Sequence, residues 1–180
     1  MRTSLLAASG LSLGLIFSPA LVGAPALADP AYKADAVSDF FVDAMNGKSR
    51  KLCIGANDKC RLEPTGAQAK FDLLVNFEFN SDKLTSVARE NLDEFARSLA
   101  DPRLQDQKFA IDGHTDATGA EQYNLGLSER RAAAVVAYLA SQGSDAARLK
   151  ALGFGKSRPL DPADPFNARN RRVETHLLEK

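Results

Sequence analysis

The strongest constraint on the fold is the alternation of strand-like and helix-like apolar patterns from residue 67 onward. Residues 73–79 place apolar side chains at every second position, which is the spacing of a strand with one buried face. Shorter strand-like segments lie at 109–111, 151–155 and 172–178. Because each segment is short and is bounded by polar or turn-forming residues, we expect four strands in this part of the chain.

Two helix-like segments separate these strands. The first begins after Thr85 or Ser86, either of which can cap a helix, and ends before Asp101. Its apolar side chains are spaced so that they share one face: Ala88, Leu92, Phe95 and Leu99. The second helix is expected from 125 to 142, and Gly143 is of the residue type that commonly ends a helix.

The resulting order is β-α-β-α-β-β, an α/β (α+β) arrangement. Helices and strands in this order predict a two-layer sandwich, in which the helices cover one side of a mixed four-stranded sheet. Residues 156–170 contain three prolines and are expected to form a long ordered loop between the last two strands. The pattern therefore predicts one domain, over 67–180.

The first 28 residues have the layout of a secretory signal peptide. A basic start at Arg2 is followed by an apolar run over 5–17, and residues 26–28 form a small-x-small cleavage site. The apolar run is short for a membrane span, and an uncleaved N-terminal anchor is the alternative interpretation. We therefore expect 1–28 to be removed and no transmembrane span in the mature protein.

The chain that remains after this removal is almost neutral. Arg2 is the only charged side chain in the signal segment, so the 23 basic side chains fall to 22, against 23 acidic ones. Nucleic-acid binding and docking on anionic lipid both favour a basic face. The charge balance therefore argues against nucleic acid and anionic lipid as partners.

An amphipathic helix is expected within 29–47, ahead of the domain. Its apolar side chains fall on one face: Val37, Phe40, Phe41, Ala44 and Met45. The helix can pack on the disulfide loop or the main domain, or residues 35–46 can recruit an envelope protein as a partner. Two adjacent phenylalanines favour burial, so packing is the preferred interpretation.

Two cysteines, Cys53 and Cys60, lie in a basic, loop-rich connector after this helix. In an oxidising compartment such a pair predicts a small-loop disulfide. A zinc site would need more ligands than the two histidines, His114 and His176, can supply, so no metal is expected. The helix and the disulfide loop together define an N-terminal extension over 29–66.

Arg131 lies where the apolar pattern calls for an uncharged side chain. It falls in the stripe of the predicted helix 125–142, four residues from both Leu127 and Val135. A guanidinium on a core-facing stripe is unfavourable unless it is paired or opens into a polar pocket. Arg131 therefore requires an anion, which is either an internal carboxylate or part of a ligand.

The candidate acidic partner is Asp116, in the loop that precedes this helix. Loops between the carboxyl end of a strand and the start of a helix commonly form ligand sites. Asp116 can take an ammonium and Arg131 can hold a carboxylate with its forked guanidinium, so the pair suits a zwitterion. In the structural alternative, Asp116 forms a turn with its own backbone and pairs internally with Arg131.

Three ordered motifs resemble the OmpA-like C-terminal domain family. They read DGHTDATG from Asp112, YNxxLSxxRAxxV from Tyr123 and NRRVE from Asn170. This family includes the peptidoglycan-associated lipoprotein and the periplasmic domain of MotB, and the resemblance covers about 70–180. Three motifs in the right order make the resemblance specific.

The resemblance implies non-covalent binding of peptidoglycan through meso-diaminopimelate. By the positions of the motifs, Asp116 would hold the amine of diaminopimelate and Arg131 its carboxylate. The further positions carried over as ligand-binding are Asn80, Thr115, Asn124, Leu127 and Arg172, of which Arg172 is also compatible with a structural role. The implied location is the periplasm of a Gram-negative bacterium, with outer-membrane association as a further hypothesis.

Two other functions are alternatives to this binding role. A peptidoglycan hydrolase would need two poised carboxylates or a histidine-rich zinc site. The two histidines lie in separate motifs and the chain has no HExxH pattern, which argues against a hydrolase. We therefore expect no enzyme and no cofactor. A periplasmic scaffold protein would act mainly through its N-terminal helix. The motifs favour binding, which would link the protein, and through it a partner or the outer membrane, to the cell wall.

Overall fold

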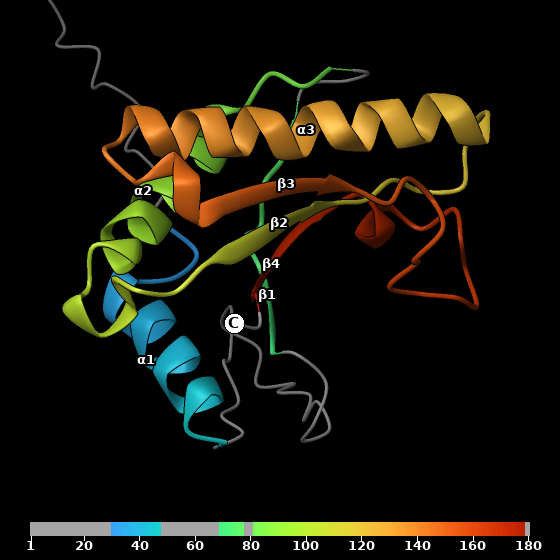
Figure 1. Ribbon diagram of the computed structural model, residues 1–180. Coiled ribbons are helices and arrows are strands. Elements are labelled where there is room, and N and C mark those ends of the chain that lie inside the picture. Colours follow the sequence, from blue (N-terminus) through green and yellow to red (C-terminus); the bar gives the residue numbers. More distant parts are fainter. Residues whose placement is uncertain (1–29, 48–68, 78–80, 179–180) are drawn as a thin grey trace, which may run out of the picture.

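The computed structural model describes residues 30–47, 69–77 and 81–178, which form three long helices and one sheet (Figure 1). The helices are α1 (Ala34–Met45), α2 (Ser86–Leu99) and α3 (Glu121–Ser141), and the strands are β1 (Lys70–Asp72), β2 (Phe109–Gly113), β3 (Leu149–Gly153) and β4 (Val173–Leu177). Short 3-10 turns occupy Pro102–Leu104, Ala146–Arg148 and Ala168–Asn170. The predicted signal peptide, the predicted disulfide between Cys53 and Cys60, and Asn80 lie outside the described residues.

The sheet is mixed, as the strand and helix order predicts. Its strands lie in the order β1-β4-β2-β3, with β2 and β3 parallel and β4 antiparallel to both of its neighbours. The last strand therefore lies between the first and the second. No helix in the described part of the chain is long and apolar enough to cross a membrane.

The two faces of the sheet differ in character because side chains alternate along each strand. Phe71, Thr175 and Ile111 lie opposite one another across β1, β4 and β2, and all three are buried. Phe71 and Ile111 belong to the hydrophobic core beneath the helices. The next row, Asp72, Glu174 and Asp112, points to the opposite face, which none of the described helices covers and which is called the helix-free face below.

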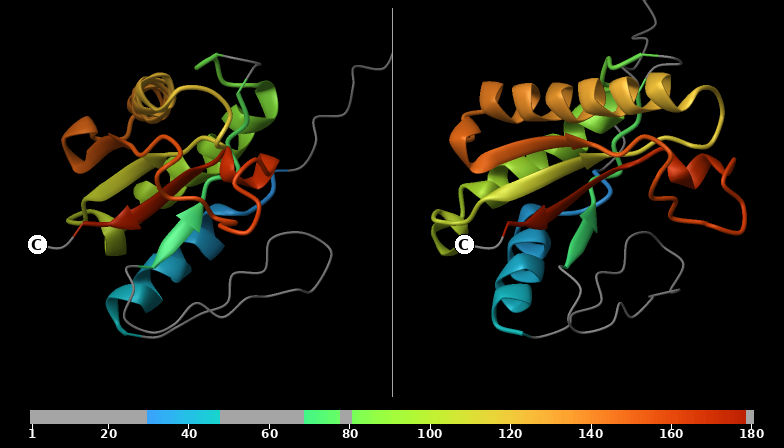
Figure 2. Two further views of the ribbon diagram at one scale, coloured as in Figure 1. Left: turned by 90° about the vertical axis from the view of Figure 1, so that its right-hand side faces the viewer. Right: turned by 45° about the vertical axis from the view of Figure 1, so that its right-hand side comes forward.

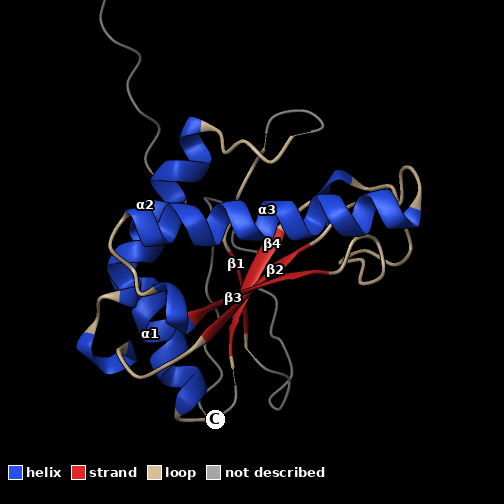
Figure 3. Cartoon of the chain, turned by 45° about the horizontal axis from the view of Figure 1, so that its top comes forward, coloured by secondary structure: helices blue, strands red, loops and turns tan. Residues whose placement is uncertain are grey.

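The long helix α3 extends over β2 and β3, whereas α1 lies beside β1 (Figure 2). From above, the strands fan out beneath α3 (Figure 3). Glycine permits this close approach, because a Cβ at Gly113 would collide with the backbone oxygen of Ser128 on α3. Gly153 in β3 faces the same turn of the helix, against Ser128 and Glu129.

The helix α1 packs into the core of the domain, as its paired phenylalanines predict. The ring centroid of Phe41 lies 5.1 Å from that of Phe109, 6.1 Å from Phe71 and 6.4 Å from Phe95. Val37 and Phe41 are fully buried. These rings join α1, α2, β1 and β2 in one hydrophobic core, which positions the helices relative to the sheet.

Helix α2 follows its prediction closely. Thr85 is its N-cap, and the Thr85 side chain accepts a hydrogen bond from the backbone nitrogen of Ala88 at 3.2 Å. All four side chains predicted to share its apolar face are buried: Ala88, Leu92, Phe95 and Leu99.

The first strand is shorter and earlier than predicted. Instead of 73–79 it spans Lys70–Asp72, and Phe77 forms only an isolated bridge with Leu84. Leu74 has a φ of 48°, which ends the extended conformation, and its amide nitrogen donates to Asp72 Oδ1 at 2.9 Å. The predicted alternation in burial still holds, since Leu73 and Val75 are buried.

Helix α3 begins at Glu121, four residues before its predicted start. Its N-cap is Ala120, which makes no side-chain capping bond, so the sequence signal for this start is weak. Gly143, with a φ of 92°, follows the end of the helix as predicted. Strand β3 covers Leu149–Gly153 rather than 151–155, and β4 lies within the predicted 172–178.

Candidate functional site

The predicted ligand loop follows the carboxyl end of β2 and leads into α3. It is held at both ends of its turn by the long loop between β3 and β4. The Thr115 nitrogen donates to the Gly155 oxygen at 2.9 Å, and the Ala117 nitrogen donates to the Pro165 oxygen at 2.9 Å. Asp116 lies between these two anchors, so the position of its carboxylate is well defined.

Asp116 is almost buried, with 9% of its surface exposed, and both of its oxygens are engaged. Oδ1 accepts from the Thr118 nitrogen at 3.0 Å, which forms the turn foreseen in the structural alternative. Oδ2 accepts from Arg171 Nη1 at 2.8 Å. The cationic partner of Asp116 is therefore Arg171, and not Arg131 as the structural alternative supposed.

The local hydrogen bonds keep the Asp116 carboxyl ionised. Burial raises the pKa of this carboxyl, but the hydrogen bonds from Arg171 and Thr118 outweigh burial and hold the pKa below its ordinary value. Asp116 is consequently a carboxylate at neutral pH, which is the form that an ammonium requires.

Arg131 is buried in α3, with 8% of its surface exposed. Its Nε donates to the backbone oxygen of Ser81 at 3.1 Å, and its guanidinium carbon lies 4.8 Å from the centre of the Phe77 ring. Within the described residues no carboxylate forms an ion pair with it. Burial, and then the nearby Arg171, lower the pKa of Arg131, yet a guanidinium stays protonated in proteins. Arg131 is thus a desolvated cation with capacity for an anion.

Three other predicted ligand residues lie in this loop or in the first turns of α3. Thr115 Oγ1 donates to the backbone oxygen of Asp116 at 2.9 Å. Asn124, in the first turn of α3, donates through Nδ2 to the Thr118 oxygen at 2.8 Å. Leu127 is buried at 7% exposure, on the same helix as Arg131. The hydrogen bonds of Thr115 and Asn124 shape the loop around Asp116.

Arg172 is engaged elsewhere, on the helix-free face of the sheet. Its Nε donates to Glu174 Oε1 at 2.6 Å, and both side chains are buried. This contact supports the structural role considered for Arg172. The residue that meets Asp116 is its neighbour Arg171, which is not among the predicted ligand residues. The sequence did offer a signal for Arg171. Adjacent side chains in an extended segment point to opposite sides, so only one of Arg171 and Arg172 can face the loop that contains Asp116.

His114 does not form a nucleophile–base pair with Ser128. Its ring stacks on Phe154, with centroids 5.5 Å apart, and is 1% exposed. Ser128 Oγ instead donates to the Leu125 oxygen at 2.7 Å and accepts from the Gly155 nitrogen at 2.8 Å. The part of the chain that the structure describes contains no cluster of three or more side chains suited to a metal ion.

Comparisons with known proteins point to one family. The family model described as "OmpA family" matches residues 76–172. The peptidoglycan-associated lipoprotein of Pseudomonas aeruginosa is 40% identical over 100 residues, which cover 54% of this chain and 58% of that protein. Outer membrane protein A of Bordetella avium is 39% identical over 118 residues, which cover 64% of this chain and 59% of that protein.

A solved structure extends the likeness to the fold. It is that of a putative MotB-like protein from Desulfovibrio vulgaris, with a TM-score of 0.51 and 30% sequence identity. The match covers 62% of this chain and 72% of that one. The chain spans about six tenths of the length of the two curated relatives above.

Proposed function

Because the chain belongs to the OmpA family, we propose that it binds peptidoglycan non-covalently through meso-diaminopimelate, and that it is not an enzyme. The name of the peptidoglycan-associated lipoprotein supports the cell-wall partner. The observation that carries the proposal is Arg131, a buried cation that has no carboxylate partner within the described residues. A ligand carboxylate is the anion that it lacks.

The site would bind the two charges of the diaminopimelate side-chain end separately. The carboxylate lies against Arg131, where a charge-assisted hydrogen bond contributes about 1.5–3 kcal/mol. The ammonium replaces Arg171 at Asp116. The Arg171 side chain is 50% exposed, so water screens its ion pair, and losing that pair costs about 1 kcal/mol or less. The exchange therefore favours the bound state.

Pelleting with purified diaminopimelate-type sacculi tests this assignment. We expect Arg131→Ala and Asp116→Ala each to weaken binding about tenfold to a hundredfold, because one charge of the zwitterion is left unpaired. Arg130→Ala is the matched control for the first change, since Arg130 is the exposed neighbour on the same helix. Asp106→Ala, at an exposed turn, is the control for the second.

Circular dichroism of each variant should match the parent protein, so that loss of binding reports on the site. Undiminished pelleting of both Arg131→Ala and Asp116→Ala would refute the site assignment. Soluble muropeptides released from the sacculi by the parent protein would refute the non-enzymatic role.

We further propose a periplasmic location for a mature chain that consists of the 29–66 extension and the 67–180 domain. The curated relatives are outer-membrane and lipoprotein members of the family, which supports the cell envelope of a Gram-negative bacterium. Mass spectrometry of the exported protein would test removal of 1–28 and the predicted disulfide. Partner recruitment by 35–46 is not favoured, because Val37 and Phe41 are buried in the protein's own core.

A further inference from the structure

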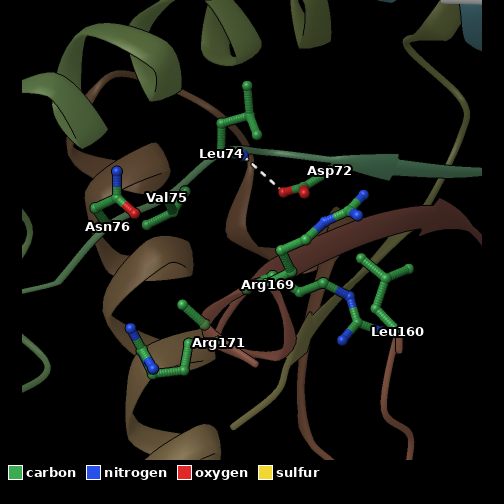
Figure 4. A pocket seen from close by; sticks show the side chains of 9 residues that line it. Asp72, Leu74, Val75, Asn76, Leu160, Arg169 and Arg171 are labelled. Atoms are coloured by element: carbon green, nitrogen blue, oxygen red, sulfur yellow. Dashed lines mark hydrogen bonds between the residues drawn. The ribbon is translucent and has the colours of Figure 1, made fainter. Parts of the chain in front are cut away.

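A hollow of about 400 Å³ shares Arg171 with the proposed diaminopimelate site, because Arg171 both lines the hollow and binds Asp116. Figure 4 shows the side chains that line it. One wall is the segment that follows β1, and the opposite wall is the loop before β4. The lining side chains are Asp72, Leu74, Val75, Asn76, Leu160, Ala168, Arg169, Arg171 and Arg172. The lining therefore combines three guanidinium groups with a few apolar side chains.

The three arginines differ in how far they are already paired. Arg172 is bonded to Glu174, and Arg171 to Asp116. The Arg169 guanidinium is exposed and makes no hydrogen bond or ion pair with the rest of the described chain. Arg169 is therefore the cation of this hollow that is available to an anion.

The single acidic side chain of the lining does not fill that role. Asp72 Oδ1 accepts the amide of Leu74 at 2.9 Å, which commits it to the turn after β1. Burial raises the pKa of Asp72, so its environment disfavours the charge. The lining consequently has an excess of positive charge that favours an incoming carboxylate.

Arg171 connects this hollow to the site already described. Its side chain lines the hollow, and its Nη1 is the group that an incoming ammonium would displace from Asp116. Once displaced, Arg171 is a second free guanidinium on the same wall as Arg169. Occupation of Asp116 would therefore increase the affinity of the hollow for an anion.

We propose that this hollow binds a second carboxylate of the peptidoglycan stem peptide, held by Arg169 together with the released Arg171. The inference rests on the proposed function, since it needs the diaminopimelate ammonium at Asp116. The stem peptide carries such carboxylates on both sides of diaminopimelate, at the α-position of D-glutamate and at a terminal D-alanine. Leu74, Val75 and Leu160 would contact its methylene and methyl groups.

Calorimetric titration with defined ligands tests the proposal. The ligands are free meso-diaminopimelate, the tripeptide L-Ala-γ-D-Glu-meso-diaminopimelate with the C-terminal carboxyl of diaminopimelate amidated, and the same tripeptide with the glutamate carboxyl amidated as well. A fourth ligand, the glutamate-amidated peptide extended by D-alanine, supplies the terminal carboxylate instead. We expect a peptide with a second carboxylate to bind about threefold to tenfold more tightly than the doubly amidated tripeptide.

Arg169→Gln should remove this advantage and leave the affinity for free diaminopimelate unchanged. Arg158→Gln is the matched control, because Arg158 lies in the same loop but stacks on Phe154, with 3.8 Å between guanidinium carbon and ring centre. The control should retain the full advantage of the second carboxylate.

The outcomes separate this inference from the proposed function. If neither carboxylate position strengthens binding, or if Arg169→Gln keeps the advantage, the second subsite is wrong while diaminopimelate binding stands. An equal loss in Arg158→Gln would likewise overturn the subsite, because a diffuse charge effect would then explain the advantage. If the parent protein fails to bind free diaminopimelate, the proposed function itself fails.

Discussion

Arg171 and Arg172 are neighbours in the chain and each binds a carboxylate, but the two pairs lie in different surroundings. The Arg171 side chain, paired with Asp116, is 50% exposed, whereas the Arg172 and Glu174 side chains are 7% and 9% exposed. Water can replace a partner in the first pair, but in the second pair either charge alone would stay buried. The same chemical contact is therefore open to water at the predicted ligand loop and buried on the sheet.

The surroundings of Glu174 strengthen this contrast. Lys70 Nζ lies 3.2 Å from Glu174 Oε2, and His114 Nε2 lies 3.6 Å from the same oxygen. Beside them, His176 Nδ1 lies 3.2 Å from Asp112 Oδ2 in the neighbouring row of the sheet. The helix-free face thus has a network of charged and titratable groups that spans β1, β2 and β4.

Removing the buried partner should produce the largest change in stability. We expect Arg172→Ala to lower the free energy of unfolding by about 3 kcal/mol, because Glu174 would lose its buried guanidinium. Arg171→Ala should lower it by about 1 kcal/mol or less, because the Arg171 side chain is half exposed and water can take its place beside Asp116. Urea unfolding followed by circular dichroism measures both, and equal losses in the two variants would remove the distinction between the pairs.

Acid should weaken the buried pair in a defined direction. Burial raises the pKa of the Glu174 carboxyl, but the nearby His114 ring and the hydrogen bond from Arg172 outweigh burial and hold the pKa well below the ordinary 4.5. A carboxyl whose pKa is depressed by folding stabilises the protein fully above its unfolded pKa, and this contribution is lost as the pH falls further. Unfolding free energies measured from about pH 7 to pH 3 should therefore decline below about pH 5.

The matched variant for this measurement is Glu174→Gln, which should show a shallower decline. A variant is needed because Asp72 contributes an acid dependence of the opposite sign. Burial raises the pKa of Asp72, so protonation of this carboxyl stabilises the folded protein as the pH falls. Identical slopes in the parent protein and Glu174→Gln would show that this carboxyl does not contribute to the acid dependence.

The exposed pair should give the smallest effect, on binding rather than stability. Without Arg171, burial would act on the pKa of Asp116 with less opposition, so the carboxyl would take up a proton at higher pH. In Arg171→Gln the acid midpoint for binding free diaminopimelate should therefore move to higher pH. Affinity near pH 7 should change by about fivefold or less. An unmoved midpoint would mean that Arg171 does not control this carboxyl.

Periodicity predicted the fold well because burial of apolar faces dominates it. The faces of α2 and the core positions Leu73 and Val75 follow directly from spacing. The boundaries were harder, since they depend on local backbone chemistry. The left-handed Leu74 ends β1 early, and Ala120 begins α3 without a side-chain cap.

The part of the candidate site that lies on α3 could be predicted from helix geometry. Spacing placed Arg131 on the buried stripe, and the structure confirms its burial. Its contact with Ser81 could not be predicted, because the two residues are 50 positions apart in the chain. Alternation at the NRR motif distinguishes Arg171 from Arg172, but it does not show that Arg171 reaches Asp116. That contact depends on the path of the β3–β4 loop, which has no periodic pattern, and so Arg171 was missed. Asn80 stays a prediction.

The central place of β4 in the sheet has a consequence for synthesis. Among the described strands β1 pairs only with β4, and β2 would have only β3 beside it until Val173–Leu177 emerge from the ribosome. Arg171 is synthesised just before β4, the strand that joins β1 to β2. A chain that stalls before its final segment would therefore lack both a closed sheet and the cation beside Asp116. Only polypeptides synthesised through β4 can have both the closed sheet and the ion pair between Arg171 and Asp116.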